Sequence, residues 1–177
     1  MMHTFKPQKN LFLLMSTARA TLSNRLSTDD NIMGAVVGVV GCGRWGMTHL
    51  KTLSMLKDRG LISAIHACDI NPSTELEAIK YADTFCTDWQ TLVSNHDLDA
   101  VAIVTPVDTH HDLALALLDH CNALFIEKPI GLSQTEASSI IAKVQETGSK
   151  LLVGHILRFN EVINEAMKLI SNGEIGE

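Results

Sequence analysis

The chain has 177 residues, enough for one domain, and its 46% hydrophobic and 19% charged residues are typical of a folded globular protein. A formal charge of -6 and the lack of a basic stripe argue against a nucleic-acid partner. The longest apolar runs, such as 35–40 and 100–104, are far shorter than the roughly 20 residues of a membrane span, so we expect no membrane partner either.

Residues 1–33 differ in composition from the rest of the chain. Up to Ser27 they carry basic residues but no acidic one, and they show no amphipathic period. A transit peptide would have such a composition. We favour a flexible extension, or a start codon placed too early with Met33 as the true start.

From Gly34 onward, short β-branched apolar runs alternate with amphipathic stretches of about ten to fifteen residues. This alternation is typical of βαβ units and predicts an α/β fold with a parallel sheet. The predicted strands are 35–40, 62–68, 100–105, 123–126 and 151–155, with a weaker strand at 84–86. Helix starts are indicated by Asn71-Pro72, by Thr87-Asp88, and by a capping box at Ser133 and Glu136.

The four cysteines are scattered without the spacing of metal ligands or of CxxC motifs. At least three of them fall inside apolar segments. We therefore predict no metal site, and we interpret the cysteines as reduced core thiols of a cytoplasmic protein. They are Cys42, Cys68, Cys86 and Cys121.

The motif GCGRWG follows the first predicted strand and opens a helix that runs to about residue 57. In a dinucleotide fingerprint, Gly41 permits the tight turn, Gly43 lets the backbone approach a pyrophosphate, and Gly46 lets the helix pack close to the strand. The N-terminus of that helix offers N–H groups and a partial positive charge to the phosphates. The motif therefore predicts a dinucleotide site.

Asp69 ends the second predicted strand, where a carboxylate can accept hydrogen bonds from the adenosine ribose. It favours NAD over NADP, because it would repel the extra phosphate of NADP. Within the motif, Arg44 could reach a phosphate or remain solvated, whereas we expect Trp45 to pack while its N–H serves the phosphate. Proteins that bind FAD or S-adenosylmethionine share parts of this pattern and remain alternatives.

Two more motifs follow predicted strands, VTPVDTH at 104–110 and FIEKP at 125–129. With GxGxxG, TPxxxH and EKP in this order, the chain resembles the Gfo/Idh/MocA family of oxidoreductases. The segment GHILRFN at 154–160 is also similar to a segment of that family, although Glu161 stands where a proline is common. The resemblance runs from about residue 35 to the end, and it implies a Rossmann-type doubly wound parallel sheet over residues 34–160.

The resemblance assigns roles to the EKP residues. It implies that Lys128 lies close to both the nicotinamide and the substrate hydroxyl, where an ammonium can stabilise a developing alkoxide or shuttle a proton. It implies that Glu127 accepts hydrogen bonds from the nicotinamide-side ribose or positions the loop, and that Pro129 makes the loop rigid. A solvated ion pair of Glu127 and Lys128 is the alternative.

The resemblance also implies that Thr105, Pro106 and His110 line the cofactor groove, although His110 could instead cap its helix. His155 and Arg158 could approach the nicotinamide or the substrate, and a purely structural role for both is equally open.

The function implied by the resemblance is hydride transfer between NAD and a secondary alcohol of a sugar, an inositol or a sugar nucleotide. We expect residues 161–177 to form a linking helix and the start of an α+β substrate domain that this chain lacks. A noncatalytic dinucleotide-binding module, or an inactive gene remnant, is the alternative. We therefore expect a chain that binds the cofactor without completing an active site.

Overall fold

The computed structural model describes residues 34–174, so the expectations for residues 1–33 and 175–177 lie outside the described part. Its six strands are all parallel and form one sheet in the order β3-β2-β1-β4-β5-β6. This arrangement confirms the predicted doubly wound α/β fold. The strands are β1 (Ala35–Val40), β2 (Ile62–Cys68), β3 (Thr84–Cys86), β4 (Leu98–Ile103), β5 (Cys121–Ile126) and β6 (Lys150–Val153).

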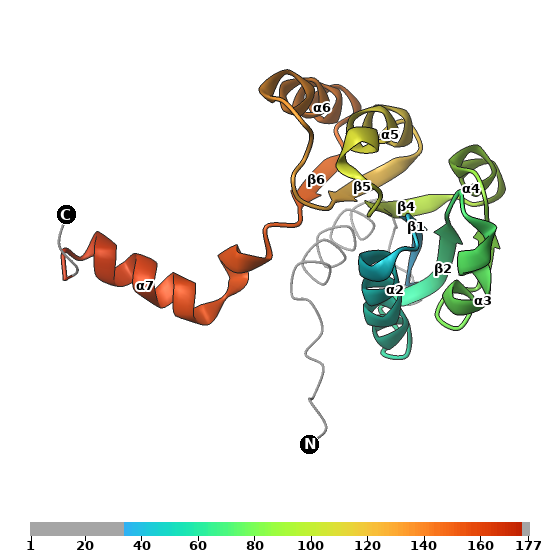
Figure 1. Ribbon diagram of the computed structural model, residues 1–177, viewed down its shortest axis with the longest axis horizontal. Helices are drawn as coiled ribbons and strands as arrows, with labels where there is room; N and C mark the ends of the chain where they lie inside the picture. Colours follow the sequence, from blue (N-terminus) through green and yellow to red (C-terminus); the bar gives the residue numbers. More distant parts are fainter. Residues whose placement is uncertain (1–33, 175–177) are drawn as a thin grey trace, which may run out of the picture.

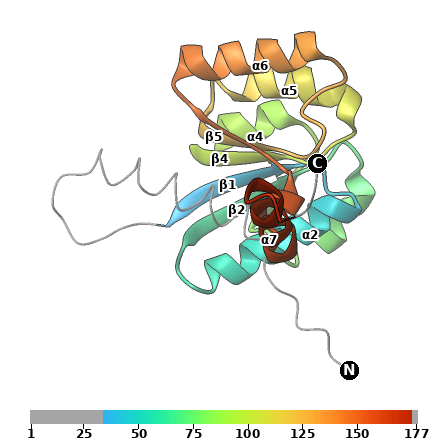
Figure 2. The same ribbon diagram turned by 90° about the vertical axis from the view of Figure 1, so that its left-hand side faces the viewer.

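Helices cover both faces of the sheet (Figures 1 and 2). One face carries α2 (Arg44–Lys57) and α3 (Glu75–Ala78). The other face carries α4 (Trp89–Asn95), α5 (His110–Leu117) and α6 (Gln134–Thr147). Short 3-10 turns precede three of the helices, namely η1 (Pro72–Thr74), η2 (Val107–Thr109) and η3 (Ile156–Phe159).

The central strands are apolar on both sides because each side meets a layer of helices. In β1, Val37 and Val39 belong to the hydrophobic cluster beneath α2, whereas Val36 and Val40 pack into the cluster beneath α4 and α5. Near-continuous apolar runs of this kind are typical of parallel sheets that are buried on both faces.

Three of the predicted strands differ from the observed ones at their ends. The strand predicted at 100–105 is Leu98–Ile103, because Leu98 already pairs with Cys121 in β5. The side chain of Asp99 also accepts a hydrogen bond from the backbone N–H of Val36 at 2.8 Å. Long-range pairing therefore extends β4 into a polar segment that the apolar pattern excludes.

The predicted helix starts are confirmed by the side chains at the N-caps. Asn71, Asp88 and Ser133 each accept a hydrogen bond from a backbone N–H in the first turn that follows. At the other end of α6, Gly148 adopts a left-handed conformation with φ of 69°. These caps fix where the connections leave the sheet.

Helix α7 (Glu161–Ser171) extends away from the sheet and packs mainly on η3 (Figure 1). Its apolar side chains Val162, Met167 and Ile170 are 77%, 57% and 52% exposed. Within residues 34–174, no helix has the length and apolar content that a membrane span requires.

Candidate functional site

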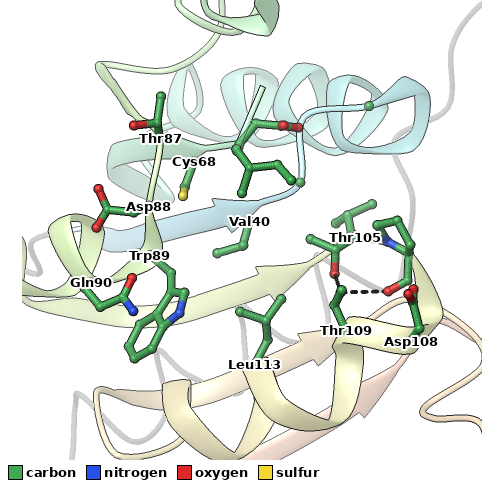
Figure 3. A pocket seen from close by; sticks show the side chains of 16 residues that line it. Val40, Cys68, Thr87, Asp88, Trp89, Gln90, Thr105, Asp108, Thr109 and Leu113 are labelled. Atoms are coloured by element: carbon green, nitrogen blue, oxygen red, sulfur yellow. Dashed lines mark hydrogen bonds between the residues drawn. The ribbon is translucent and has the colours of Figure 1, made fainter. Parts of the chain in front are cut away.

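A cavity of about 450 Å³ opens at the carboxyl ends of the central strands (Figure 3). Strands β1 and β4 are neighbours there, but α2 leaves on one face of the sheet and α5 on the other. This is the topological switch point at which open α/β sheets bind ligands. The lining residues include Gly41, Gly43, Asp69, Ile70, Thr87, Asp88, Trp89, Thr105, Pro106 and Thr109.

Two glycines of the turn between β1 and α2 are required by the backbone itself. Gly41 has φ of 97°, and a Cβ there would lie 2.6 Å from the carbonyl oxygen of Val104. A Cβ on Gly46 would lie 1.9 Å from the carbonyl oxygen of Gly41. Gly43 differs, since a Cβ there would meet nothing within 4 Å. The space in front of the N-terminus of α2 is therefore open.

Asp69 lies at the wall of the cavity and is tied to the glycine turn. Its Oδ2 accepts a hydrogen bond from the backbone N–H of Cys42 at 2.6 Å, and its Oδ1 accepts one from the N–H of Asn71 at 2.8 Å. Beside it, Ile70 is 89% exposed. The carboxylate is thus held next to the open space at Gly43, with lone pairs left for further donors.

The loop after β4 forms the opposite wall of the cavity. The hydroxyl of Thr109 lies 2.6 Å from the hydroxyl of Thr105 and 2.7 Å from the carbonyl oxygen of Pro106 (Figure 3). His110 lies behind this wall, almost fully buried, and does not line the cavity. Its ring nitrogens are each 2.9 Å from a carbonyl oxygen, that of Thr105 and that of Pro129. His110 therefore joins the loop after β4 to the loop after β5.

Glu127 and Lys128 follow β5, at the same edge of the sheet. The Oε1 of Glu127 lies 2.8 Å from Nε2 of His49 on α2, and its Oε2 accepts the backbone N–H of Lys128 at 3.2 Å. Burial alone raises the pKa of Glu127, but the hydrogen bond from His49 and the nearby charges hold its pKa below the ordinary value. The Lys128 side chain is exposed, and the Lys128–Pro129 peptide is cis.

The remaining predicted residues lie outside the cavity. Arg44 and Trp45 are on the first turn of α2, and Trp45 is 51% exposed rather than packed. Arg158 is exposed on η3. The cavity wall thus brings together Gly41, Gly43, Asp69, Thr105 and Pro106, whereas Gly46, His110 and Glu127 support it from behind.

Sequence reasoning missed two groups of residues. Thr87, Asp88 and Trp89 line the cavity, although the sequence identifies this segment only as a helix start. They reach the site because β3 lies beside β2, so that both strands end at the same edge. The buried His49, three residues after Gly46 on the same helix, carries no sequence signal for its contact with Glu127.

Several known proteins similar to this chain are oxidoreductases. The sequence model described as "Oxidoreductase family, NAD-binding Rossmann fold" matches residues 35–155. The chain is 35% identical over 140 residues to inositol 2-dehydrogenase of Rhizobium meliloti, and the match covers 79% of this chain and 42% of that relative. It is 32% identical over 147 residues to scyllo-inositol 2-dehydrogenase (NAD(+)) of Bacillus subtilis, covering 78% and 41%.

A solved structure shows the same likeness. Scyllo-inositol dehydrogenase from Lactobacillus casei, crystallised with NAD(H) and scyllo-inositol, matches with a TM-score of 0.72 at 26% identity. That match covers 81% of this chain and 43% of the other. The chain therefore spans less than half the length of these relatives. The family match over most of the chain, together with the parallel sheet and its glycine turn, shows that the chain belongs to the Gfo/Idh/MocA oxidoreductases and carries their NAD-binding Rossmann domain.

Proposed function

We propose that the chain is the NAD-binding part of an oxidoreductase that transfers hydride between a nicotinamide and a secondary alcohol of an inositol, a sugar or a sugar nucleotide. The observation that carries this proposal is the cavity at the switch point, which is lined by the glycine turn and Asp69. Lys128 follows β5, which lies two strands from β1 in the sheet. The two inositol dehydrogenases with at least 32% identity support the substrate class.

The residues of the cavity fit a dinucleotide. Pyrophosphate would lie over Gly43, where no Cβ intervenes and the N-terminus of α2 supplies N–H groups. The adenosine ribose would donate its hydroxyls to Asp69. Because Asp88 also lines this part of the cavity, a 2′-phosphate would meet two carboxylates. We therefore propose NAD rather than NADP as the cofactor.

Lys128 would act on the substrate rather than on the dinucleotide. The bound nicotinamide would accept or donate the hydride. In the direction of reduction, the Lys128 ammonium would donate a hydrogen bond to the carbonyl oxygen, stabilise the alkoxide that develops as hydride arrives, and pass a proton to that oxygen; in oxidation, the Lys128 amine would take the hydroxyl proton as hydride leaves the carbon. Thr105 and Pro106 would form the wall at the nicotinamide end, and Arg158 would approach from η3. Within residues 34–174, no element covers Lys128 to hold the substrate against the nicotinamide, so turnover would need further protein structure.

The cofactor assignment is tested by calorimetry with NAD and with NADP on the wild type and on Asp69→Ala. Losing a charged hydrogen-bond acceptor costs about 1.5–3 kcal/mol, so NAD affinity should fall at least about tenfold. As a control, Asp58→Ala removes an equal charge at the far end of α2, away from the cavity, and should leave NAD affinity unchanged. Because Asp69 also holds Cys42, a thermal melt must show that the variant is folded. Tighter binding of NADP than of NAD by the wild type would contradict the assignment.

A further inference from the structure

The buried histidine of α2 has a single polar contact among the described residues. His49 has no exposed surface, its Nε2 lies 2.8 Å from Oε1 of Glu127, and its Nδ1 has no partner within residues 34–174. Buried polar groups are nearly always paired, because an unpaired one loses its hydrogen bonds to water. The contact with Glu127 is therefore the interaction that explains a histidine at this position.

Of the two neutral tautomers of His49, the geometry favours the one with the proton on Nε2. A neutral imidazole has one N–H and one bare nitrogen. With the proton on Nε2, His49 donates to the carboxylate and leaves Nδ1 as an unpaired acceptor. The other tautomer would place a lone pair against the carboxylate and bury an unpaired N–H. The ring of Phe125, 5.0 Å away and tilted by 60°, packs against the imidazole from β5.

The carboxylate of Glu127 is held on its other side as well. Its Oε2 accepts the backbone N–H of Lys128. At the end of β6, a Cβ on Gly154 would approach Oε2 to 3.0 Å, so a glycine leaves the space that the carboxylate needs. The group is only 15% exposed and does not line the cavity. Glu127 thus links α2 to the backbone of Lys128 and lies close to the end of β6.

We propose that His49 is a positioning residue: it orients Glu127, and Glu127 in turn fixes the loop that presents Lys128. The helix that receives the pyrophosphate and the loop that carries the ammonium are thereby held in one geometry. In this assignment Glu127 serves the loop rather than the ribose. The role for Lys128 rests on the proposed function, whereas the link between His49 and the Lys128 backbone does not.

The test compares His49→Met, which removes the donor, with His49→Gln, whose amide N–H₂ can replace Nε2–H. Backbone amide exchange is measured by NMR on the full chain. In His49→Met, the hydrogen bond from His49 no longer orients the Glu127 carboxylate, which accepts the Lys128 N–H. The Lys128 amide should therefore exchange about tenfold faster. Amides of β1 and β4 should exchange as in the wild type. His49→Gln should restore slow exchange at Lys128.

Further measurements separate positioning from general loss of structure. In the wild type, the 15N shifts of His49 should show a protonated Nε2 and a bare Nδ1. NAD affinity of His49→Met should stay within about twofold of wild type, because the glycine turn and Asp69 are untouched. If His49→Met does not fold, Glu127→Ala is the second variant, and it should raise exchange at Lys128 in the same way.

Three outcomes would overturn the proposal. They are unchanged exchange at Lys128 in both His49→Met and Glu127→Ala, equal effects of Met and Gln at position 49, or faster exchange throughout β1 and β4. The exchange experiment needs no cofactor. If the wild-type chain binds no dinucleotide, the proposed function is refuted. The exchange experiment still tests whether His49 and Glu127 position the Lys128 loop.

Discussion

Adding a methyl group to two glycines of one turn should affect two different properties: the stability of the fold at one glycine and NAD binding at the other. In Gly46→Ala, the new Cβ would lie 1.9 Å from the carbonyl oxygen of Gly41 and 2.8 Å from its carbonyl carbon. In Gly43→Ala, the Cβ would meet nothing within 4 Å, and its φ of -69° suits any residue. Gly46→Ala should therefore lower the stability of the fold, whereas the methyl group of Gly43→Ala enters the space that we propose for pyrophosphate.

The magnitudes follow from these distances. Relief of the contact at Gly46 needs a shift of about 1 Å or more between two backbone segments, because neither neighbour is a flexible side chain. Forced packing costs typically about 1–3 kcal/mol, and a rigid backbone neighbour places Gly46→Ala at about 3 kcal/mol or above. That is a large part of a typical stability of about 5–15 kcal/mol. Gly43→Ala should change stability by less than about 1 kcal/mol.

Urea unfolding followed by circular dichroism measures the first effect, and calorimetry with NAD measures the second. Gly43→Ala should weaken NAD binding by about 2 kcal/mol, or roughly 30-fold, because the pyrophosphate can no longer reach the N–H groups of the turn. Wild-type stability in Gly46→Ala would refute the packing argument. Wild-type NAD affinity in Gly43→Ala would remove pyrophosphate from this turn.

Three other predictions follow from the described residues. Burial, and next the charge of the stacked His96, lower the pKa of His66, so the folded chain binds fewer protons than the unfolded chain. Its free energy of unfolding should therefore fall as the pH drops below 6.5, by at most about 1.4 kcal/mol per pH unit from this group, and His66→Asn should flatten the slope in urea titrations. Replacing both Met167 and Ile170 by lysine should reduce the fluorescence of a bound hydrophobic dye, because these exposed side chains form part of the uncovered face of α7; unchanged fluorescence would place the dye elsewhere. The chain should reduce NAD with polyols at most feebly, and in a longer chain that does turn over, Lys128→Met should lower kcat about hundredfold, which corresponds to about 3 kcal/mol of transition-state stabilisation. Near-normal turnover in that variant would remove Lys128 from the mechanism.

The parts of the fold that sequence could predict are those with a local physical signature. The runs of β1 and β2 are bounded as predicted, because most of their residues are buried and turn residues flank both strands. Asn71 and Ser133 mark helix starts for an equally local reason, since the capping bond joins residues only two or three positions apart. The ends of β4 could not be read in this way, because the pairing of Leu98 with Cys121 is a contact between distant segments.

In the candidate site too, residues with a local sequence pattern could be predicted, and residues placed by contacts between distant segments could not. Gly41, Gly43 and Asp69 are visible in the sequence, because a turn that lacks Cβ atoms and an acid at the next strand end form a pattern within one βαβ unit. Only the tertiary structure shows that Asp88 faces the same cavity, that His110 lies behind its wall, and that His49 holds Glu127 from 78 positions away. The physical reason is that strand order decides which loops share an edge of the sheet. Side-chain direction then decides which of their polar groups face the cavity and which hold one another in place.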